Sequence, residues 1–506
     1  MDILSGLAHG FHVATTPAAL GMCVLGVVLG TIIGVLPGLG PSATIAMLLP
    51  LTFKLEPAGA MIMLAGIYYG AKYGGSTTSI LLNVPGENSS VVTCIDGYQM
   101  ARKGRAGPAL GMAAIASFIA GTFGVVALML VAPPLAKLSL AFSSPEYFAL
   151  MVMGLAMVVL LAGDSLLKAL LAMLVGLWIS SIGTDLFTAT TRFAFGQVEL
   201  LGGIEFIIVA IGVFAVGEVL GNIEPEEPPA MVPVPKGLRN LLPTLEDFKR
   251  CRFAFLNGSV VGFLIGVLPG AGSTIASFIS YGIEKAVSRH PEEFGKGAIE
   301  GVAAPEGSNN AETGGALVPL LTLGIPGSST TAILLAALIL WGFKPGPLFI
   351  QDQPALFWGL VASMYIGNVL LLILNLPLVA VFAQLVRVPS YVIYPLILGV
   401  SLVGVYSEGS SVFDLGLLAL FGLLGYGMRK LDYPTAPLVL GLVLGAPMER
   451  ALRQSLMMSQ GSLSILLRPI PATLLVAAAL LLAIPLIRRL NAVRVQVLDR
   501  EQGENP

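Results

Sequence analysis

A Pro-Gly turn set in apolar sequence occurs twice in this chain in nearly the same letters, as GVLPGLGPSATIA at 34–46 and GVLPGAGSTIASF at 266–278. Each copy is followed by a second break rich in glycine, serine and threonine, at 74–90 and at 314–331. Interrupted helices survive at membrane depth only where they line a cavity or are buried in protein. Matching interruptions in two halves of a chain are the best pointer from sequence to a transporter's binding site. We therefore expect a duplicated membrane unit whose helices are broken at equivalent places.

The composition requires a bilayer as the solvent. The chain has 506 residues, of which 56% are hydrophobic and only 11% are charged, whereas soluble domains carry about 25% charged residues. A soluble protein of this size has no way to bury so much apolar surface. The net charge of −2 indicates neither nucleic-acid binding nor a strongly charged partner surface.

The apolar runs predict an all-α polytopic membrane protein of about 12 transmembrane helices, with re-entrant or broken helices, at about 20 residues per span. Runs long enough to span lie near 18–36, 58–82, 108–135, 145–162, 165–183, 203–221, 253–268, 355–385, 390–405, 411–427, 433–447 and 469–487. The two repeats are expected to be inverted, because many secondary transporters are built that way. A parallel arrangement stays open, since segment 18–53 either crosses once or folds back.

Polar sequence divides the chain into segments. The first transmembrane half is predicted at 1–221, a polar linker at 222–252 and the second transmembrane half at 253–405. Residues 406–490 are expected to form additional C-terminal transmembrane helices, and 491–506 a tail. Arginines gathered at the start of the tail place it in the cytoplasm by the positive-inside rule.

The first break of each half is predicted to begin a new helix at membrane depth. Proline removes a backbone donor and glycine favours turns, so neither sequence continues the preceding helix. A helix N-terminus carries roughly half a positive charge and binds anions, so several converging N-termini would hold a carboxylate. Ser273 is expected to be the N-cap of the second new helix. The substrate-binding candidates at this pair of breaks are Pro37, Gly38, Gly40, Ser42, Thr44, Gly270, Gly272, Ser273 and Thr274.

The second break of each half has the same character. Its hydroxyls and amides can donate to an anion, and its unwound carbonyls can coordinate Na⁺, a hard cation that prefers oxygen ligands. The alternative interpretation is that these are small-residue packing sites and kinks, which two matched pairs of breaks argue against. The candidates here are Ser76, Thr77, Pro85, Gly86, Asn88, Ser89, Pro326, Gly327, Ser328, Ser329 and Thr330.

Lys72 is an ionisable residue inside an otherwise apolar span. Such residues are costly in a bilayer and point to function by default. The amine would supply positive charge to a carboxylate substrate or pair with an acid such as Glu87. Alternatively, it snorkels to a membrane interface.

A polar run, EGVAAPEGSNNAETGG at 300–315, leads into a short apolar arm near 310–325. Asn310, Glu312 and Thr313 in this run are candidates for binding the coupling cation. The alternative for the run, above all for Glu300 and Glu306, is a solvated loop.

Enzyme signatures are missing. The chain has no H-E-x-x-H, no P-loop and no nucleophile elbow. The three cysteines have no metal-binding spacing, and the histidines, His9, His12 and His290, lie outside the apolar runs. We predict a protein that is not an enzyme, has no metal site, and needs no cofactor beyond a coupling ion, Na⁺ or H⁺. The remaining alternatives are an anion channel and an intramembrane enzyme that uses Lys72 with Glu87.

Longer stretches around the breaks carry a family resemblance. The most specific are GVLPGLGPSATIAMLLPLTF at 34–53, the segment from YYGAKYGGSTTS to GRAGPAL at 68–110, GVLPGAGSTIASFISYGIEK at 266–285, the segment from PEGSNNAETGG to LLAAL at 305–338, and GFKPGPLF at 342–349. With these, residues 20–490 resemble the large membrane subunit of the tripartite tricarboxylate transporters, the TctA-type permeases.

The resemblance implies a multi-pass permease of the bacterial inner membrane that takes up carboxylates by symport with an ion. It implies two protein partners, a small membrane subunit (TctB-like) and a periplasmic solute-binding protein (TctC-like), and is compatible with a higher oligomer. Substrates of the family range from tricarboxylates to dicarboxylates and aromatic acids, so the resemblance does not fix the substrate. Lys72 departs from the family pattern, in which the matching position is commonly uncharged.

Overall fold

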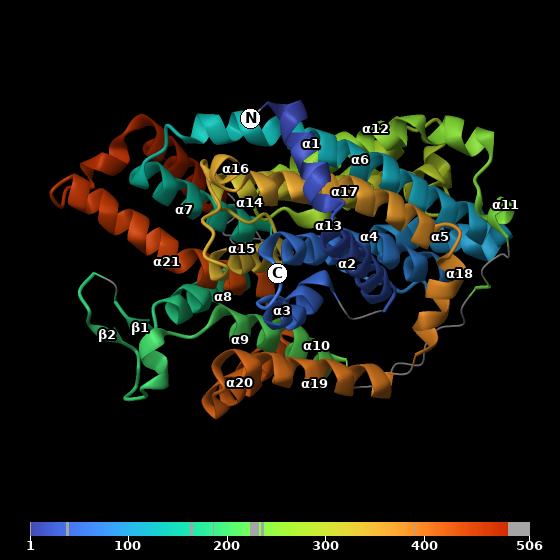
Figure 1. The fold of residues 1–506 in the computed structure, drawn as a ribbon. Helices are drawn as coiled ribbons and strands as arrows, with labels where there is room; N and C mark the ends of the chain where they lie inside the picture. The colour runs from blue at the N-terminus through green and yellow to red at the C-terminus, as the bar shows by residue number, and fades with distance from the viewer. Residues whose placement is uncertain are drawn as a thin grey trace, which may run out of the picture. The chain divides into compact units, whose positions relative to one another are not determined.

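The computed structural model describes residues 2–36, 40–161, 165–185, 187–222, 232–233, 237–388 and 390–483. Within these ranges the chain is almost entirely helical (Figure 1). A two-stranded antiparallel hairpin joins β1 (Gly183–Thr184) to β2 (Thr191–Arg192). The prediction of an all-α protein is therefore confirmed.

Seven described helices are long and apolar enough to cross a membrane. They occupy Pro17–Val35, Asn88–Ser139, Ser144–Leu161, Leu245–Val267, Pro354–Asn375, Val412–Lys430 and Thr435–Met458. Apolar helices of 10–17 residues accompany them, among them Pro41–Thr52 and Ser329–Leu340. A multi-pass membrane protein is thus supported, whereas the number of about twelve spans and the inverted arrangement stay predictions.

The chain forms two compact units, each of which is described by itself. Unit 1 comprises Met1–Leu140 and Ile204–Asp432, and unit 2 comprises Ala141–Gly203 and Tyr433–Pro506. The α-helices of unit 1 are α1 (Ile3–Ala14), α2 (Pro17–Val35), α3 (Pro41–Thr52), α4 (Pro57–Leu82), α5 (Val91–Met100), α6 (Ala106–Ser139), α9 (Phe206–Ala210), α10 (Gly217–Gly221), α11 (Leu238–Leu241), α12 (Leu245–Val267), α13 (Gly272–Val287), α14 (Glu300–Leu323), α15 (Ser329–Leu340), α16 (Phe349–Asp352), α17 (Pro354–Asn375), α18 (Val379–Phe382), α19 (Ser390–Gly409) and α20 (Val412–Lys430). Short 3-10 and π turns of this unit are η1 (Asn88–Ser90), η2 (Ala101–Arg105), η4 (Ile211–Val216), η5 (Pro291–Glu293) and η6 (Ala383–Arg387).

Unit 2 contains α7 (Ser144–Leu161), α8 (Leu166–Ser180), η3 (Glu199–Gly202), α21 (Thr435–Met458) and η7 (Leu463–Leu467), besides the hairpin. Helix α21 packs against both α7 and α8. Asp185, in the hairpin loop, pairs with Arg192 and with Arg453 of α21. The hairpin is therefore held to α21 by charge.

Two helix pairs in unit 1 pack by matching glycine contacts. On α2, a side chain added at Gly30 or Gly34 would collide with backbone oxygens of Ile67 and Ala71 on α4. On α12, the corresponding Gly262 and Gly266 meet the backbone oxygens of Ser308 and Glu312 on α14 in the same way. Small residues four apart let two membrane helices approach backbone to backbone.

At the second break of each half, the preceding helix ends and the next one begins with the same local geometry. Helix α4 ends in a left-handed residue, Asn83 at φ 58°, and α14 ends in Gly324 at φ 69°. After the Pro-Gly of each break, Glu87 caps η1 and Ser328 caps α15, each through a capping box. Counted back from these two helix ends, Lys72 on α4 and Thr313 on α14 occupy equivalent positions.

The structure differs in detail from three interpretations of the sequence. The polar run at 300–315 is not a loop, because all of it belongs to α14, and Glu300 and Glu306 are buried. Ser273 is not the N-cap of α13; Ala271 holds that place, and Ser273 lies in the first turn. Helix α12 begins at Leu245, within the predicted linker at 222–252, whose bounds stay a prediction.

Other boundary predictions fall partly on undescribed parts of the chain. Residues 223–231 and 234–236 of the linker, and the whole tail at 491–506, lie outside the described residues. The division into halves at 1–221 and 253–405, with additional helices at 406–490, stays a prediction.

Candidate functional site

The helices that follow the breaks begin close to one another in unit 1. The hydroxyls of Ser42, in the first turn of α3, and Thr330, in the first turn of α15, are 2.7 Å apart. The backbone N–H of Gly270 donates to the carbonyl of Gly327 at 2.8 Å. Ser42 and Thr330 thus join the first break of the first half to the second break of the second half, and the Gly270–Gly327 bond joins the two breaks of the second half.

Lys72 also joins two of the breaks. It is 3% exposed, so its amine does not snorkel. Its Nζ lies 3.1 Å from Oε2 of Glu87 and donates at 2.5 Å to the hydroxyl of Ser273 in the first turn of α13. The same amine stands over the ring of Tyr68, 5.6 Å from its centroid. A single cation therefore bridges the second break of the first half and the first break of the second half.

Two buried polar atoms beside this bridge have no hydrogen-bond partner among the described residues. Glu312 accepts a hydrogen bond from the Tyr68 hydroxyl at 2.9 Å through Oε2, while its Oε1 has no partner. The hydroxyl of Ser89 on η1 is also unpartnered, and Ser89 is fully buried. Leaving such a group unsatisfied costs roughly 1–3 kcal/mol, so each atom marks a place where a ligand, ion or water would bind.

The other candidates at the first pair of breaks lie around these contacts. Thr44 is buried and donates to the carbonyl of Gly40, which caps α3. Gly272 starts α13 at φ 65°, and Thr274 follows in the first turn of that helix. Pro37 and Gly38 lie outside the described residues.

The candidates at the second pair of breaks differ in exposure. Ser76 and Thr77 are buried in the last turns of α4. Pro85 and Gly86 form the turn before η1, as Pro326 and Gly327 do before α15. Asn88 is exposed, and Ser329 is half-buried at the start of α15.

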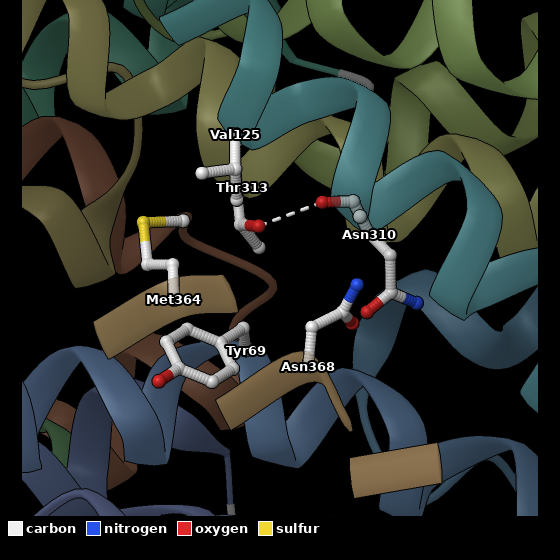
Figure 2. Close-up of a pocket in the computed structure, with 7 residues that line it drawn as sticks. Tyr69, Val125, Asn310, Thr313, Met364 and Asn368 are labelled. Atoms are coloured by element: carbon white, nitrogen blue, oxygen red, sulfur yellow. Dashed lines mark hydrogen bonds between the residues drawn. The ribbon is translucent and has the colours of Figure 1, made fainter. Parts of the chain in front are cut away.

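The three cation candidates are not brought together. Asn310 and Thr313 line a small cavity of about 10 Å³, with room for about one water at most, which Tyr69, Met364 and Asn368 also line (Figure 2). Glu312 does not line this cavity and bonds Tyr68 instead. Of the three residues predicted to bind the coupling cation, two therefore line the cavity, and Glu312 lies beside Tyr68.

Three polar residues of the core escaped sequence analysis. Tyr68 reaches Glu312, and the Tyr73 hydroxyl donates at 2.5 Å to Asn368 of α17. Asp96, on α5, is fully buried. The signal that could have found the tyrosines is their spacing in YYGAKY at 68–73, which puts them on the helix that carries Lys72.

Asp96 holds the start of α14 in place. One carboxylate oxygen accepts the backbone N–H groups of Gly295, Gly297 and Ala298 at 2.7–2.9 Å, and the other accepts the hydroxyl of Tyr281 at 2.8 Å. The negative charge at a helix start is favourable. These bonds position the start of α14.

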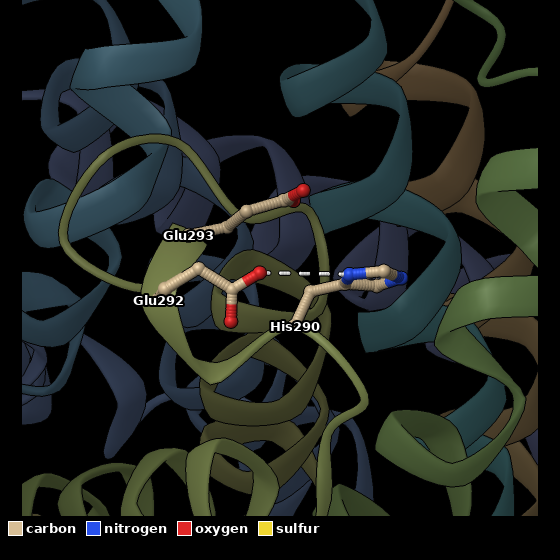
Figure 3. Close-up of side chains that lie close together, drawn as sticks. All are labelled: His290, Glu292 and Glu293. Atoms are coloured by element: carbon tan, nitrogen blue, oxygen red, sulfur yellow. Dashed lines mark ion pairs between the residues drawn. The ribbon is translucent and has the colours of Figure 1, made fainter.

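One group of the described residues has the spacing of metal ligands. Figure 3 shows His290, Glu292 and Glu293 around η5, with an ion pair of 3.7 Å between His290 and Glu292. Glu293 is already bonded by Arg250 at 2.8 Å, which lowers the pKa of this carboxyl. Exposed acidic groups of this kind are common without a metal, so we assign this one to the loop.

A family model described as the tripartite tricarboxylate transporter TctA family matches residues 20–440. The chain belongs to the tripartite tricarboxylate transporter TctA family.

Two relatives come from Agrobacterium vitis. An "Uncharacterized 52.8 kDa protein in TAR-I ttuC' 3'region" is 48% identical over 502 residues, covering 99% of this chain and 100% of the relative. An "Uncharacterized protein in TAR-II ttuC' 3'region" is 44% identical over 237 residues, which is 47% of this chain and 98% of the relative. No solved structure matches the chain.

Proposed function

We propose that this chain is the permease subunit of a secondary active transporter that takes up a carboxylate anion together with a coupling ion. The observation that carries the proposal is the meeting of the helix starts around Lys72. Its amine bonds both Glu87 and Ser273, which belong to different halves of the chain. Helix N-termini bind anions through free N–H groups, and a lysine adds a full positive charge.

The substrate carboxylate would replace Glu87 as the partner of Lys72. Ser42, Ser89, Ser273 and Thr330 would then offer hydroxyls to it from the four restarted helices. The unpartnered Ser89 hydroxyl supports this, because it is buried and has no other acceptor or donor within the described chain.

Charge balance explains why uptake would need a cation. Lys72 is accompanied by two buried carboxyl groups, Glu87 and Glu312, so ionisation of all three leaves the centre with a net charge of −1 before any anion enters. Bringing a further negative charge into a low-dielectric site is strongly unfavourable. A proton or Na⁺ bound at Glu312, whose Oε1 lacks a partner, would offset it, with Asn310 and Thr313 as a separate candidate place.

The family name implies a tripartite system. We accordingly propose a small membrane subunit and a periplasmic solute-binding protein as partners, and the bacterial inner membrane as the location. The broken helices would move as a block between the two sides, in an elevator-like cycle.

The test is uptake into proteoliposomes that contain this chain with its partner subunits. Radiolabelled citrate, succinate and benzoate, as a tricarboxylate, a dicarboxylate and an aromatic acid, would each be offered under an imposed Na⁺ or H⁺ gradient. Accumulation of one of them above its outside concentration is expected. Flux that only equalises the concentrations would indicate a channel, and chemical change of the solute would indicate an enzyme.

A further inference from the structure

Glu306 is a buried carboxyl group that the proposed carboxylate site does not use. It lies in α14 and has no exposed surface. One oxygen accepts the hydroxyl of Thr93 on α5, and the other accepts the side-chain N–H of Asn309 at 3.3 Å. Ser76 of α4 also hydrogen-bonds this carboxyl group, and all three donors are neutral. None of the ion pairs in the described part of the chain includes Glu306.

The titratable groups that interact electrostatically with Glu306 bring no positive charge to it. They are Glu87 at the second break, Tyr73 on α4 and Cys94 on α5. Glu87 repels a negative charge on Glu306. Ser117, on the neighbouring α6, donates to the backbone carbonyl of Glu306 rather than to its carboxyl group.

Among the charged groups on the other elements around α14, Lys249, Arg252 and Lys285 are exposed, and the more buried ones are engaged elsewhere. Lys72 of α4 bonds Glu87, and Arg250 of α12 bonds Glu300 at the start of α14. Asp96 of α5 accepts backbone N–H groups and the Tyr281 hydroxyl, and Glu284 of α13 accepts a hydrogen bond from Asn257. Helix α6 carries a single charged residue, Lys137, near its C-terminal end, and α17 carries none.

An ionised carboxylate in this position would have no counter-charge. The cost of taking a charge out of water without a partner is several kcal/mol, and such groups neutralise by binding a proton instead. Ionisable residues inside membrane helices commonly serve as proton relays.

The immediate partners do not form a site for a metal ion. Hard cations need several oxygen ligands that converge on one point. Here an O–H and an N–H group point at the carboxyl oxygens, and the side-chain oxygen of Asn309 already accepts the Asn310 amide at 2.5 Å.

We propose that Glu306 is a proton-binding site that loads and releases one proton in each transport cycle, separate from the carboxylate site around Lys72. Loading forms an O–H bond on the carboxylate with a proton from water on the outer side. Release returns that proton to water on the inner side and leaves the carboxylate. This proposal rests on the proposed function, because a proton cycle has meaning only in a transporter.

Glu306→Gln in the full complex tests it. Glutamine keeps the shape and hydrogen bonding of the protonated acid but exchanges no proton. In proteoliposomes, the variant should still exchange labelled for unlabelled substrate across the membrane at equal concentrations. It should lose accumulation driven by a pH gradient, which for one proton per substrate is about tenfold for each pH unit, and should lose the accompanying acidification seen with an internal pH dye. Ser308→Ala is the matched control, because its hydroxyl lies buried on the same helix without a partner, and it should keep both activities.

Unchanged pH-driven accumulation and acidification in Glu306→Gln would overturn the proposal, as would wild-type accumulation driven by Na⁺ alone. Absence of any accumulation or exchange in the wild type would instead refute the proposed function. A second measurement needs no transport. A hydrophobic carbodiimide, which attacks protonated carboxyl groups in apolar surroundings, should label Glu306 in wild-type membranes at neutral pH, as read by mass spectrometry. Lack of label there would contradict a protonated Glu306.

Discussion

Lys72 and Glu87 form a buried ion pair, and each side chain is 4% exposed. Replacing one partner of such a pair leaves an uncompensated charge, whereas replacing both is often neutral. The intact pair therefore adds little to the free energy of unfolding, but removing one partner alone should lower that free energy strongly.

Lys72→Met should lower stability by about 3–5 kcal/mol, because Glu87 then stays buried without a cation. The double variant Lys72→Met/Glu87→Gln should recover most of this loss but should not transport, since the positive charge for the substrate is missing. Thermal unfolding in detergent measures the first effect and uptake the second.

Lys54→Met serves as the control, because Lys54 is exposed in the turn before α4 and should change neither measurement. Transport by the double variant at wild-type rates would show that Lys72 does not bind the substrate.

At the level of elements, the Ser42–Thr330 contact joins the first turns of α3 and α15. Cysteines at both positions, Ser42→Cys/Thr330→Cys, should form a disulfide on oxidation, since the two hydroxyls are 2.7 Å apart. If the restarted helices must separate to admit substrate, the oxidised protein should lose uptake and regain it on reduction. Full uptake by a quantitatively cross-linked protein would mean that these helix starts stay together throughout the cycle.

Close packing of α2 on α4 depends on glycine. A Cβ at Gly34 would collide with the backbone oxygen of Ala71, so Gly34→Ala should cost about 1–3 kcal/mol through overpacking and lower the melting temperature. On the same helix, Gly21 has nothing within 4 Å of an added Cβ, so Gly21→Ala should be neutral or slightly stabilising. Equal melting temperatures for the two variants would contradict the packing described here.

The breaks themselves were predictable from sequence, because adjacent proline and glycine recur at equivalent places in two apolar segments, whereas single prolines such as Pro50 and Pro305 are accommodated inside helices. Helix α14 was not, since its run of Glu306, Asn309 and Asn310 resembles a loop. These side chains are tolerated in a buried helix because Thr93 and Ser117, distant in sequence, supply their hydrogen-bond partners. Likewise, only the fold reveals that Ser42 faces Thr330 and that Lys72 reaches Ser273.

At the scale of the whole molecule, the helices are mostly apolar, and only a few charged side chains are buried among them. In unit 1, Lys72 faces Glu87 and Glu312 at the meeting of the breaks, and Glu306 lies apart with neutral partners. An anion that enters such a centre needs an accompanying positive charge, so binding of substrate and of the coupling ion should be mutually dependent.

A density map of the transporter complex with its bound carboxylate substrate tests the central claim most directly. The account predicts substrate density within hydrogen-bonding distance of Lys72 and of the first turns of α3, α13 and α15, with the amine moved away from Glu87. Substrate density far from these helix starts, with the Lys72–Glu87 pair intact, would contradict it.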